Sequence, residues 1–294
     1  MTAVDLGRVG VWWSGTWRLP DDDATVDVAA ELEALGYSAL WSSGGFDLGL
    51  ASRFGRLLAA TTHIAVASGI VSIWRASPHD VAVAAAELDR SYPGRFLLGL
   101  GASHAPLVEN YARPYAHMVR YLDDLDGSDG LDAGGSAVAK DRRVLAALGP
   151  RMLELAARRA AGAHPYFVPV DHTARARQVL GNGPILAPEV TVVLERDPAT
   201  ARSVARTFTE GYLTLPNYTN NLRTLGFDDD DLTGPGSDRL VDAVVYWGDS
   251  TSIAARVAEH FAAGADHVCV QVVSSRASFP LAEYRELAPA LLGI

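Results

Sequence analysis

The sequence alternates between short apolar segments and segments with the apolar spacing of helices, and this alternation runs along most of the chain. In the first cycle, residues 8–14 (RVGVWWS) form an apolar run and residues 25–36 (TVDVAAELEALG) have apolar side chains three and four positions apart. Strands that alternate with helices in this way build a parallel sheet, because each helix returns the chain to the start of the next strand. The expected strand–helix pairs are 8–14 with 25–36, 37–43 with 49–62, 63–74 with 78–92, 94–101 with 115–127, 142–148 with 149–162, 163–170 with 172–181, 185–195 with 198–213, and 266–273 with 279–292.

Eight such pairs in 294 residues predict an α/β fold of the (β/α)8 TIM-barrel type, with residues 1–294 as a single domain. A doubly wound sheet would contain fewer strand–helix pairs and would not explain why this sequence has eight. Residues 216–250 fall between the seventh and eighth pairs, and neither flank has the composition of a linker, so we expect an insertion there. The acidic run Asp228 to Asp231 inside it is interpreted as a solvated loop or a helix start.

Charge and hydropathy restrict the partners and the location of the chain. The net charge of −10 and the absence of any Lys/Arg cluster larger than a pair argue against nucleic acid. No apolar run is long enough to span a bilayer, and the start MTAVDLGRVG lacks the apolar core of a secretory signal, so a cytoplasmic protein without a membrane partner is expected. Cys269 is the only cysteine, which excludes a disulfide within the chain, and it is interpreted as a small core residue.

Functional side chains of such barrels lie on the loops that follow the carboxyl ends of the strands. The sharpest candidate there is Gly149-Pro150-Arg151, which opens a helix directly after the fifth strand. Glycine allows a ligand to approach the backbone, and the free amides of a helix start attract a phosphate. An ordinary strand–helix turn has the same pattern, so both interpretations stand at this point.

Two further positions belong to the same edge of the barrel. Gly69-Ile70 interrupts the third strand, which indicates either a bulge with a close backbone approach to a ligand or a glycine that packs in the barrel wall. Ser103 and His104 follow the fourth strand, where an imidazole can exchange a proton near neutral pH. A structural, hydrogen-bonded histidine is the alternative.

Aromatic residues gather around these positions and predict a flat apolar pocket for an organic substrate. The expected aromatic mouth consists of Trp12, Trp13, Trp17, Trp41, Trp74 and Tyr166. Gly99 and Gly101 are expected to be small because a ligand lies against that strand end. If His104 proves structural, His164 or Tyr166 is the next candidate for the proton-transferring group.

Several other sites are excluded by their spacing. The stretch GLGASH lacks the last glycine and the downstream acid of a dinucleotide fingerprint. The sequence has no G-x-S-x-G elbow and no H-E-x-x-H motif, and its eight histidines lack ligand spacing, so no metal is expected.

Five segments resemble the bacterial luciferase-like superfamily and, within it, the oxidoreductases that depend on coenzyme F420, a deazaflavin. The resemblance covers nearly the whole chain. Its segments are ELEALGYSALW (31–41), IAVASGIVSIW (64–74), YPGRFLLGLGASHAPLVE (92–109), VLAALGPRMLELAARRAAGAHPYFV (144–168) and GADHVCVQVV (264–273).

The resemblance implies a role for each marked position. Gly69-Ile70 would be a non-prolyl cis peptide that backs the cofactor ring, and Ala102 with Ser103 would line the polyol. The cofactor phosphate would lie at the helix start formed by Gly149, Pro150, Arg151 and Met152. The substrate pocket would comprise Trp12, Trp13, Trp74 and Tyr166.

The chain departs from the family where reductases often place an acid or an Asp-His pair after the second strand. Ser42 and Ser43 stand there, so Ser42 is assigned to the cofactor site and His104 becomes the leading catalytic candidate. The resemblance leaves three functions open: an F420-dependent oxidoreductase, an FMN-dependent luciferase-like monooxygenase, and a non-catalytic flavin-binding barrel. It also implies a homodimer that pairs through helices 25–36 and 49–62.

Overall fold

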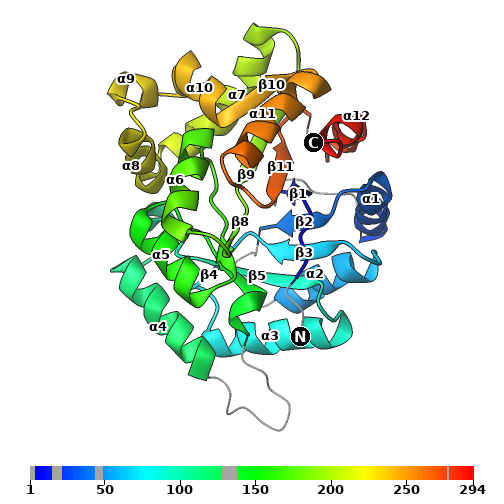
Figure 1. Ribbon diagram of the computed structural model, residues 1–294, viewed down its shortest axis with the longest axis vertical. Coiled ribbons are helices and arrows are strands. Elements are labelled where there is room, and N and C mark those ends of the chain that lie inside the picture. The colour runs from blue at the N-terminus through cyan, green and yellow to red at the C-terminus, as the bar shows by residue number, and fades with distance from the viewer. Residues whose placement is uncertain (1–3, 15–21, 44–48, 128–137, 277) are drawn as a thin grey trace.

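The protein is described by a computed structural model that covers residues 4–14, 22–43, 49–127, 138–276 and 278–294 (Figure 1). Within these residues, eleven strands form one sheet in which neighbouring strands pair in parallel. The strands are β1 (Val9–Trp13), β2 (Ala39–Ser42), β3 (Ala65–Ser68), β4 (Val71–Ser72), β5 (Phe96–Gly101), β6 (Arg143–Leu145), β7 (Gly162–Ala163), β8 (Ile185–Leu186), β9 (Glu189–Leu194), β10 (Val245–Gly248) and β11 (Val268–Val272).

Helices surround the sheet in Figure 1 and connect its parallel strands. The described helices are α1 (Asp22–Leu35), α2 (Leu50–Ala59), α3 (Pro78–Ser91), α4 (Pro114–Asp126), α5 (Pro150–Arg159), α6 (Val170–Leu180), α7 (Pro198–Leu213), α8 (Pro216–Thr224), α9 (Asp229–Leu232), α10 (Asp238–Val244), α11 (Ser250–Ala262) and α12 (Leu281–Leu291). None of them, in the described part of the chain, combines the length and the apolar character needed to cross a membrane.

The sheet closes on itself, which confirms the predicted barrel. Its strand order is β10-β9-β11-β1-β2-β3-β5-β6-β7-β8, with β4 beside β5, and β8 and β9 are separated only by Ala187 and Pro188. The backbone at this junction is hydrogen-bonded to the neighbouring segments on both sides. The Glu189 N–H donates to the Pro165 carbonyl, which follows β7 (2.9 Å), and the Cys269 N–H of β11 donates to the Pro188 carbonyl (3.0 Å). The segments β8 and β9 therefore act as one barrel strand, which pairs with β7 through β8 and with β11 through β9, and this closes the barrel.

Three expected strands are shorter or split, each for a local reason. The third strand divides into β3 and β4 at the Gly69-Ile70 peptide, and the seventh divides into β8 and β9 at Pro188, which has no N–H to donate. The sixth strand was expected over residues 163–170, but only Gly162–Ala163 is a strand. Residues 164–169 are a loop in which Pro165 and Pro169 cannot donate to a sheet ladder.

The insertion is more regular than the sequence indicated. Residues 216–250 contain α8, α9, α10 and β10, and β10 adds to the sheet beside β9. The acidic run starts α9: the Asp228 and Asp231 side chains accept each other's backbone N–H, which confirms the helix-start interpretation. Residues 250–262, to which the sequence pattern assigned no element, form α11.

Side chains alternate between the two faces of each strand and fill the barrel unevenly. One buried cluster inside the barrel combines Trp12 and Trp41 with small residues such as Ala65 and Ala67. The neighbouring residue Trp13 belongs to the larger cluster between the strands and the helices. Two large indoles thus occupy the interior near the carboxyl ends of β1 and β2, and Trp12 lines the site described next.

Candidate functional site

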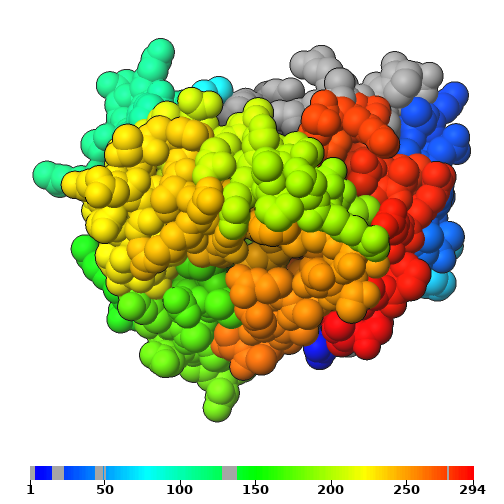
Figure 2. All heavy atoms as spheres, turned by 90° about the horizontal axis from the view of Figure 1, so that it is seen from above, coloured from blue at the N-terminus to red at the C-terminus, as the bar shows by residue number. Residues whose placement is uncertain are grey.

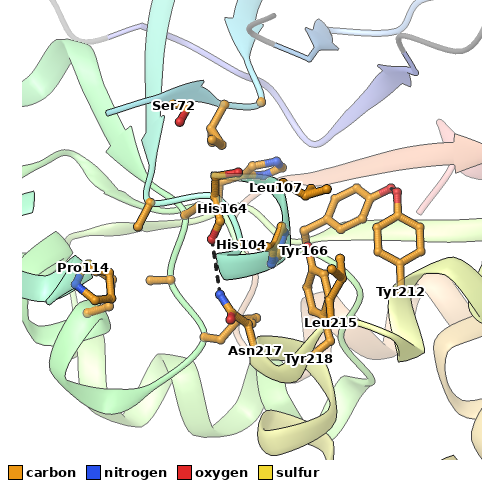
Figure 3. A pocket seen from close by; sticks show the side chains of 18 of the residues that line it. Ser72, His104, Leu107, Pro114, His164, Tyr166, Tyr212, Leu215, Asn217 and Tyr218 are labelled. Atoms are coloured by element: carbon orange, nitrogen blue, oxygen red, sulfur yellow. Dashed lines mark hydrogen bonds between the residues drawn. The ribbon is translucent and has the colours of Figure 1, made fainter. Parts of the chain in front are cut away.

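A cavity of about 590 Å³ opens at the carboxyl ends of the strands (Figure 3), within the size range typical of small-molecule sites. Its walls come from the segments that follow β1, β2, β3, β5, β6 and β7, and from α7 and α8. The described residues that line it are Trp12, Ser14, Ser43, Gly69, Ile70, Ser72, Ala102, Ser103, His104, Leu107, Tyr111, Pro114, Ala146, Ala147, Leu148, Gly149, Met152, His164, Tyr166, Tyr212, Leu215, Asn217 and Tyr218.

Most of the positions marked in the sequence meet at this cavity. The marked residues that line it are Trp12, Gly69, Ile70, Ala102, Ser103, His104, Gly149, Met152, His164 and Tyr166. The other marked residues in the described part of the chain do not line it: Trp13, Trp41, Ser42, Trp74, Gly99, Gly101, Pro150 and Arg151. Trp17 lies outside the residues that the structure describes.

Two tryptophans expected in the substrate pocket have structural roles. Trp13 packs against Phe279, with ring centroids 4.5 Å apart, because alternation along β1 turns it away from the barrel interior that Trp12 faces. Trp74 lies behind the cavity wall: its indole N–H donates to the Ala102 carbonyl (2.7 Å) and its ring stacks on His117 at 4.1 Å. Neither ring is available to a substrate in the cavity.

The start of α5 has the features expected of a phosphate site. Gly149 is the N-cap residue, no side chain caps the helix, and Pro150 occupies its first turn. A Cβ built on Gly149 would meet no atom within 4 Å, and its φ of −84° is open to any residue, so neither protein packing nor backbone conformation requires glycine there. Space is left open in front of uncapped backbone amides. The Arg151 guanidinium lies 4.3 Å from the centre of the Tyr115 ring, beside this opening.

The third strand is interrupted by a cis peptide between Gly69 and Ile70, as the resemblance implied. The Ser42 carbonyl accepts the Gly69 N–H (2.7 Å), so Ser42 supports the bulge from behind. The Ser68 hydroxyl donates to the Gly99 carbonyl (3.1 Å) and accepts the Gly99 N–H (2.8 Å). These bonds fix the bulge against β2 and β5.

Neighbouring protein atoms explain why three positions of this region are glycines. A Cβ on Gly99 would overlap the Ser68 carbonyl, and a Cβ on Gly101 would lie 2.5 Å from Cδ1 of Ile70. Both glycines therefore make room for the bulge, and the expectation that a cofactor lies directly against them is wrong. A Cβ on Gly69 would likewise overlap the Trp12 indole, which supports the interpretation of Gly69 as a packing glycine although it also lines the cavity.

His104 lies in the cavity wall, directed there by a left-handed residue, since Ser103 has a φ of 56°. Its Nδ1 atom is buried and has no hydrogen-bond partner among the described residues, and its ring centroid lies 4.9 Å from that of Tyr218. Burial lowers the pKa of His104 below the usual value of 6.5. The side chain is therefore a neutral imidazole near pH 7.

His164 lies beneath the bulge between two indoles, with ring centroids 5.5 Å from Trp12 and 4.2 Å from Trp41. Its Nδ1–H donates to the Ala187 carbonyl (2.7 Å), and no residue in the described part of the chain bonds to its buried Nε2. Burial lowers the pKa of His164 to about 4, so it too is neutral at pH 7.

One whole wall of the cavity comes from segments whose role the sequence did not reveal. Tyr212 lies in the last turn of α7, and Leu215, Asn217 and Tyr218 follow in the loop after it and in α8. The Tyr166 hydroxyl donates to Gln271 Oε1 (2.8 Å) and bonds to the Tyr212 hydroxyl (2.8 Å). Figure 3 shows the rings of Tyr166, Tyr212 and Tyr218 together on the side of the cavity away from Pro114. Figure 2 shows α7 and the insertion side by side over this part of the molecule.

A buried carboxyl group holds the loop that positions Tyr166. Glu189 is 1% exposed; one of its oxygens accepts the Thr191 hydroxyl (2.6 Å) and the other accepts the Phe167 N–H (3.3 Å). Phe167 has a φ of 56°, a conformation that favours glycine, so this bond helps to keep a strained turn in place. Burial raises the pKa of Glu189 to about 8, so the group is mostly protonated at neutral pH.

Residues 11–125 match the model of the luciferase-like monooxygenase family. The match runs from β1 to α4 and therefore includes the bulge and His104. Comparison with curated protein sequences finds no match.

Solved structures with the same fold cover almost the entire chain. An F420-dependent secondary alcohol dehydrogenase, in complex with an F420-acetone adduct, is 14% identical with a TM-score of 0.73, over 97% of this chain and 99% of the other. A coenzyme F420-dependent tetrahydromethanopterin reductase from Methanopyrus kandleri is 14% identical with a TM-score of 0.68, over 98% and 99%. The oxygenating constituent of 3,6-diketocamphane monooxygenase from Pseudomonas putida, in complex with FMN, is 15% identical with a TM-score of 0.67, over 97% and 96%.

Proposed function

The chain is luciferase-like in the sequence of residues 11–125 and in its fold, and from this premise we propose that it is an oxidoreductase dependent on coenzyme F420. The observation that carries the proposal is the open start of α5 at the cavity, where Gly149 leaves space in front of uncapped amides. A cofactor with a phosphate fits this opening. The F420-dependent relatives of similar fold support the choice of a deazaflavin.

The residues present would hold such a cofactor along the cavity. The phosphate would lie at Gly149 and Met152, with Pro150 and Arg151 in the same helical turn, and the polyol along Ala102 and Ser103. The ring would lie in the cavity against the Gly69-Ile70 bulge, which Ser42 supports from behind. When bound, a deazaflavin supplies hydride transfer.

His104 is the group that we assign to proton transfer with the substrate. It is a neutral imidazole near pH 7, because burial lowers its pKa, and a neutral imidazole accepts a proton. Its ring is positioned between the end of β5 and the Tyr218 ring. This state suits removal of the proton from a substrate hydroxyl group, and the hydride on the adjacent carbon would be accepted by the oxidised cofactor.

An FMN-dependent monooxygenase is the second candidate, supported by the FMN-bound relative with a TM-score of 0.67. The two are separated by titrating the purified protein with F420 and with FMN while following the fluorescence of each ligand. We expect F420 to bind at least about tenfold more tightly than FMN, a difference of about 1.4 kcal/mol. Tight FMN binding without F420 binding would overturn the assignment of F420 as the cofactor. Binding of both cofactors without turnover of any substrate offered would favour a non-catalytic flavin-binding barrel.

The role of His104 is tested with two substitutions. His104→Ala should leave cofactor affinity within about threefold and lower kcat by about 10²-fold, the usual size of a lost general acid or base. His104→Asn should be nearly as impaired, because an amide keeps hydrogen bonding and cannot exchange a proton near neutral pH. A lower melting temperature with unchanged activity per folded molecule would instead make His104 a structural residue.

A further inference from the structure

We infer that the substrate of this site is an uncharged molecule with an apolar body. It is selected by the tyrosine wall, to which α7 contributes Tyr212 and α8 contributes Tyr218 beside Tyr166. The inference rests on the proposed function, since it concerns the part of the cavity that the cofactor leaves to a substrate. It follows from the charge of the walls and from the direction of their polar groups.

The described walls carry no formal charge. No Asp, Glu, Lys or Arg is found among the described residues that line the cavity. The two histidines there, His104 and His164, are neutral at pH 7 because burial lowers the pKa of each. A carboxylate or ammonium group that entered would lose its hydration without gaining a partner of opposite charge, which is costly in a partly apolar site.

Among the described residues of these walls, the uncapped amides at the start of α5, at Gly149, favour an anion. In the proposed function the cofactor phosphate occupies it. An anionic substrate would therefore have to compete with the cofactor, whereas an uncharged substrate would not.

In the tyrosine wall, formed by Tyr166, Tyr212 and Tyr218, two of the three hydroxyl groups are already used in hydrogen bonds. The hydroxyls of Tyr166 and Tyr212 bond to each other, and Tyr166 also bonds to Gln271, so their polar ends are already satisfied. The Tyr212 ring packs edge-on against the Tyr218 ring at 5.5 Å. Leu215 lies in the same wall (Figure 3). Such a surface favours aromatic or alicyclic groups.

The polar end of the substrate belongs at His104. The imidazole lies 4.9 Å from the Tyr218 ring, so a molecule that packs on the tyrosine wall reaches His104 with a single hydroxyl or carbonyl group. The geometry thus fits a compact apolar molecule with one uncharged polar group.

The test uses three probes of nearly equal size: benzyl alcohol, benzoate and benzylamine, which is a cation at pH 7. Their binding to the protein saturated with F420, and in parallel with FMN, is measured by calorimetry. Benzyl alcohol should bind at least about tenfold more tightly than either ion. Equal or tighter binding of benzoate or benzylamine would overturn the inference.

A charge placed in the wall should change this order. Leu215→Arg should raise the affinity for benzoate by at least about tenfold, and Leu215→Met, the uncharged control, should keep the order of the parent protein. Asn217→Lys is the second variant, for use if Leu215→Arg fails to fold. No gain of benzoate binding in a folded charged variant would show that the probes bind elsewhere and would overturn the inference.

These outcomes are separable from failure of the proposed function. Cofactor titration and turnover test the proposed function, and probe selectivity is read from binding alone with either cofactor. A protein that binds and uses F420 yet prefers benzoate would refute only the substrate class.

Discussion

Glu189→Gln should change how stability depends on pH, because the native protein keeps this carboxyl protonated where the unfolded chain does not. The folded pKa is about 8 and the ordinary value is 4.5. Above pH 4.5 the unfolded state releases a proton that the native state retains, so unfolding becomes more favourable as pH rises toward 8. Each pH unit in this interval costs about 1.4 kcal/mol, and the 2.5 units between 4.5 and 7 therefore cost on the order of 3 kcal/mol.

The glutamine variant has no proton to lose and keeps a carbonyl acceptor for the Phe167 N–H or the Thr191 hydroxyl. Its free energy of unfolding relative to the parent protein should rise by about 3 kcal/mol between pH 4.5 and pH 7. The assay is urea denaturation of both proteins at half-unit pH steps from 4.5 to 8. Comparison at each pH cancels the contribution of buried His164 and His267, whose lowered pKa values give the opposite slope.

Glu210→Gln, at an exposed position on α7, is the matched control and should run parallel to the parent protein. Parallel profiles for Glu189→Gln as well would refute the reasoning. They would mean that Glu189 ionises in the native state, and that the turn at Phe167 is held by a charged acceptor rather than by a neutral one.

The barrel itself could be predicted from the sequence, because strand and helix periodicities are local. The start of α5 could also be predicted, because glycine followed by proline after a strand is a local signal for a helix start. The structure has Gly149 as the N-cap residue and Pro150 in the first turn. Trp12 and Trp13 show where local information ends. Alternation predicts that they face opposite sides, and only the register of β1 against β2, which pairs Trp12 with Trp41, decides which one lies inside the barrel.

The tyrosine wall could not be predicted, because long-range packing places it. Tyr212 and Tyr218 come from segments near residue 215, and they reach the cavity because β10 docks on β9 and the Tyr212 hydroxyl meets Tyr166, 46 positions earlier. The glycines of β5 were misinterpreted for a related reason. A sequence shows that a position is small, but it does not show whether a ligand or a distant backbone atom, such as the Ser68 carbonyl beside Gly99, occupies the space.

Three further measurements test the remaining reasoning. Light scattering should give a dimer mass, because α1 and α2 offer small residues for close packing between two chains, and a monomer mass would refute this. Gly149→Val should weaken cofactor binding more than Arg151→Ala, since the valine fills the space before the α5 amides whereas the arginine adds a screened charge; equal and negligible effects would move the phosphate elsewhere. Gly99→Ala should lower the free energy of unfolding by about 1–3 kcal/mol or more, as overpacking does, because the methyl group must displace the Ser68 carbonyl that shapes the bulge. Gly211→Ala, in the interior of α7, is its control, because that Cβ also enters open space and should not lower stability. If Gly99→Ala keeps the parent melting temperature and loses only cofactor affinity, then the glycine makes room for the ligand after all, and the structural explanation fails.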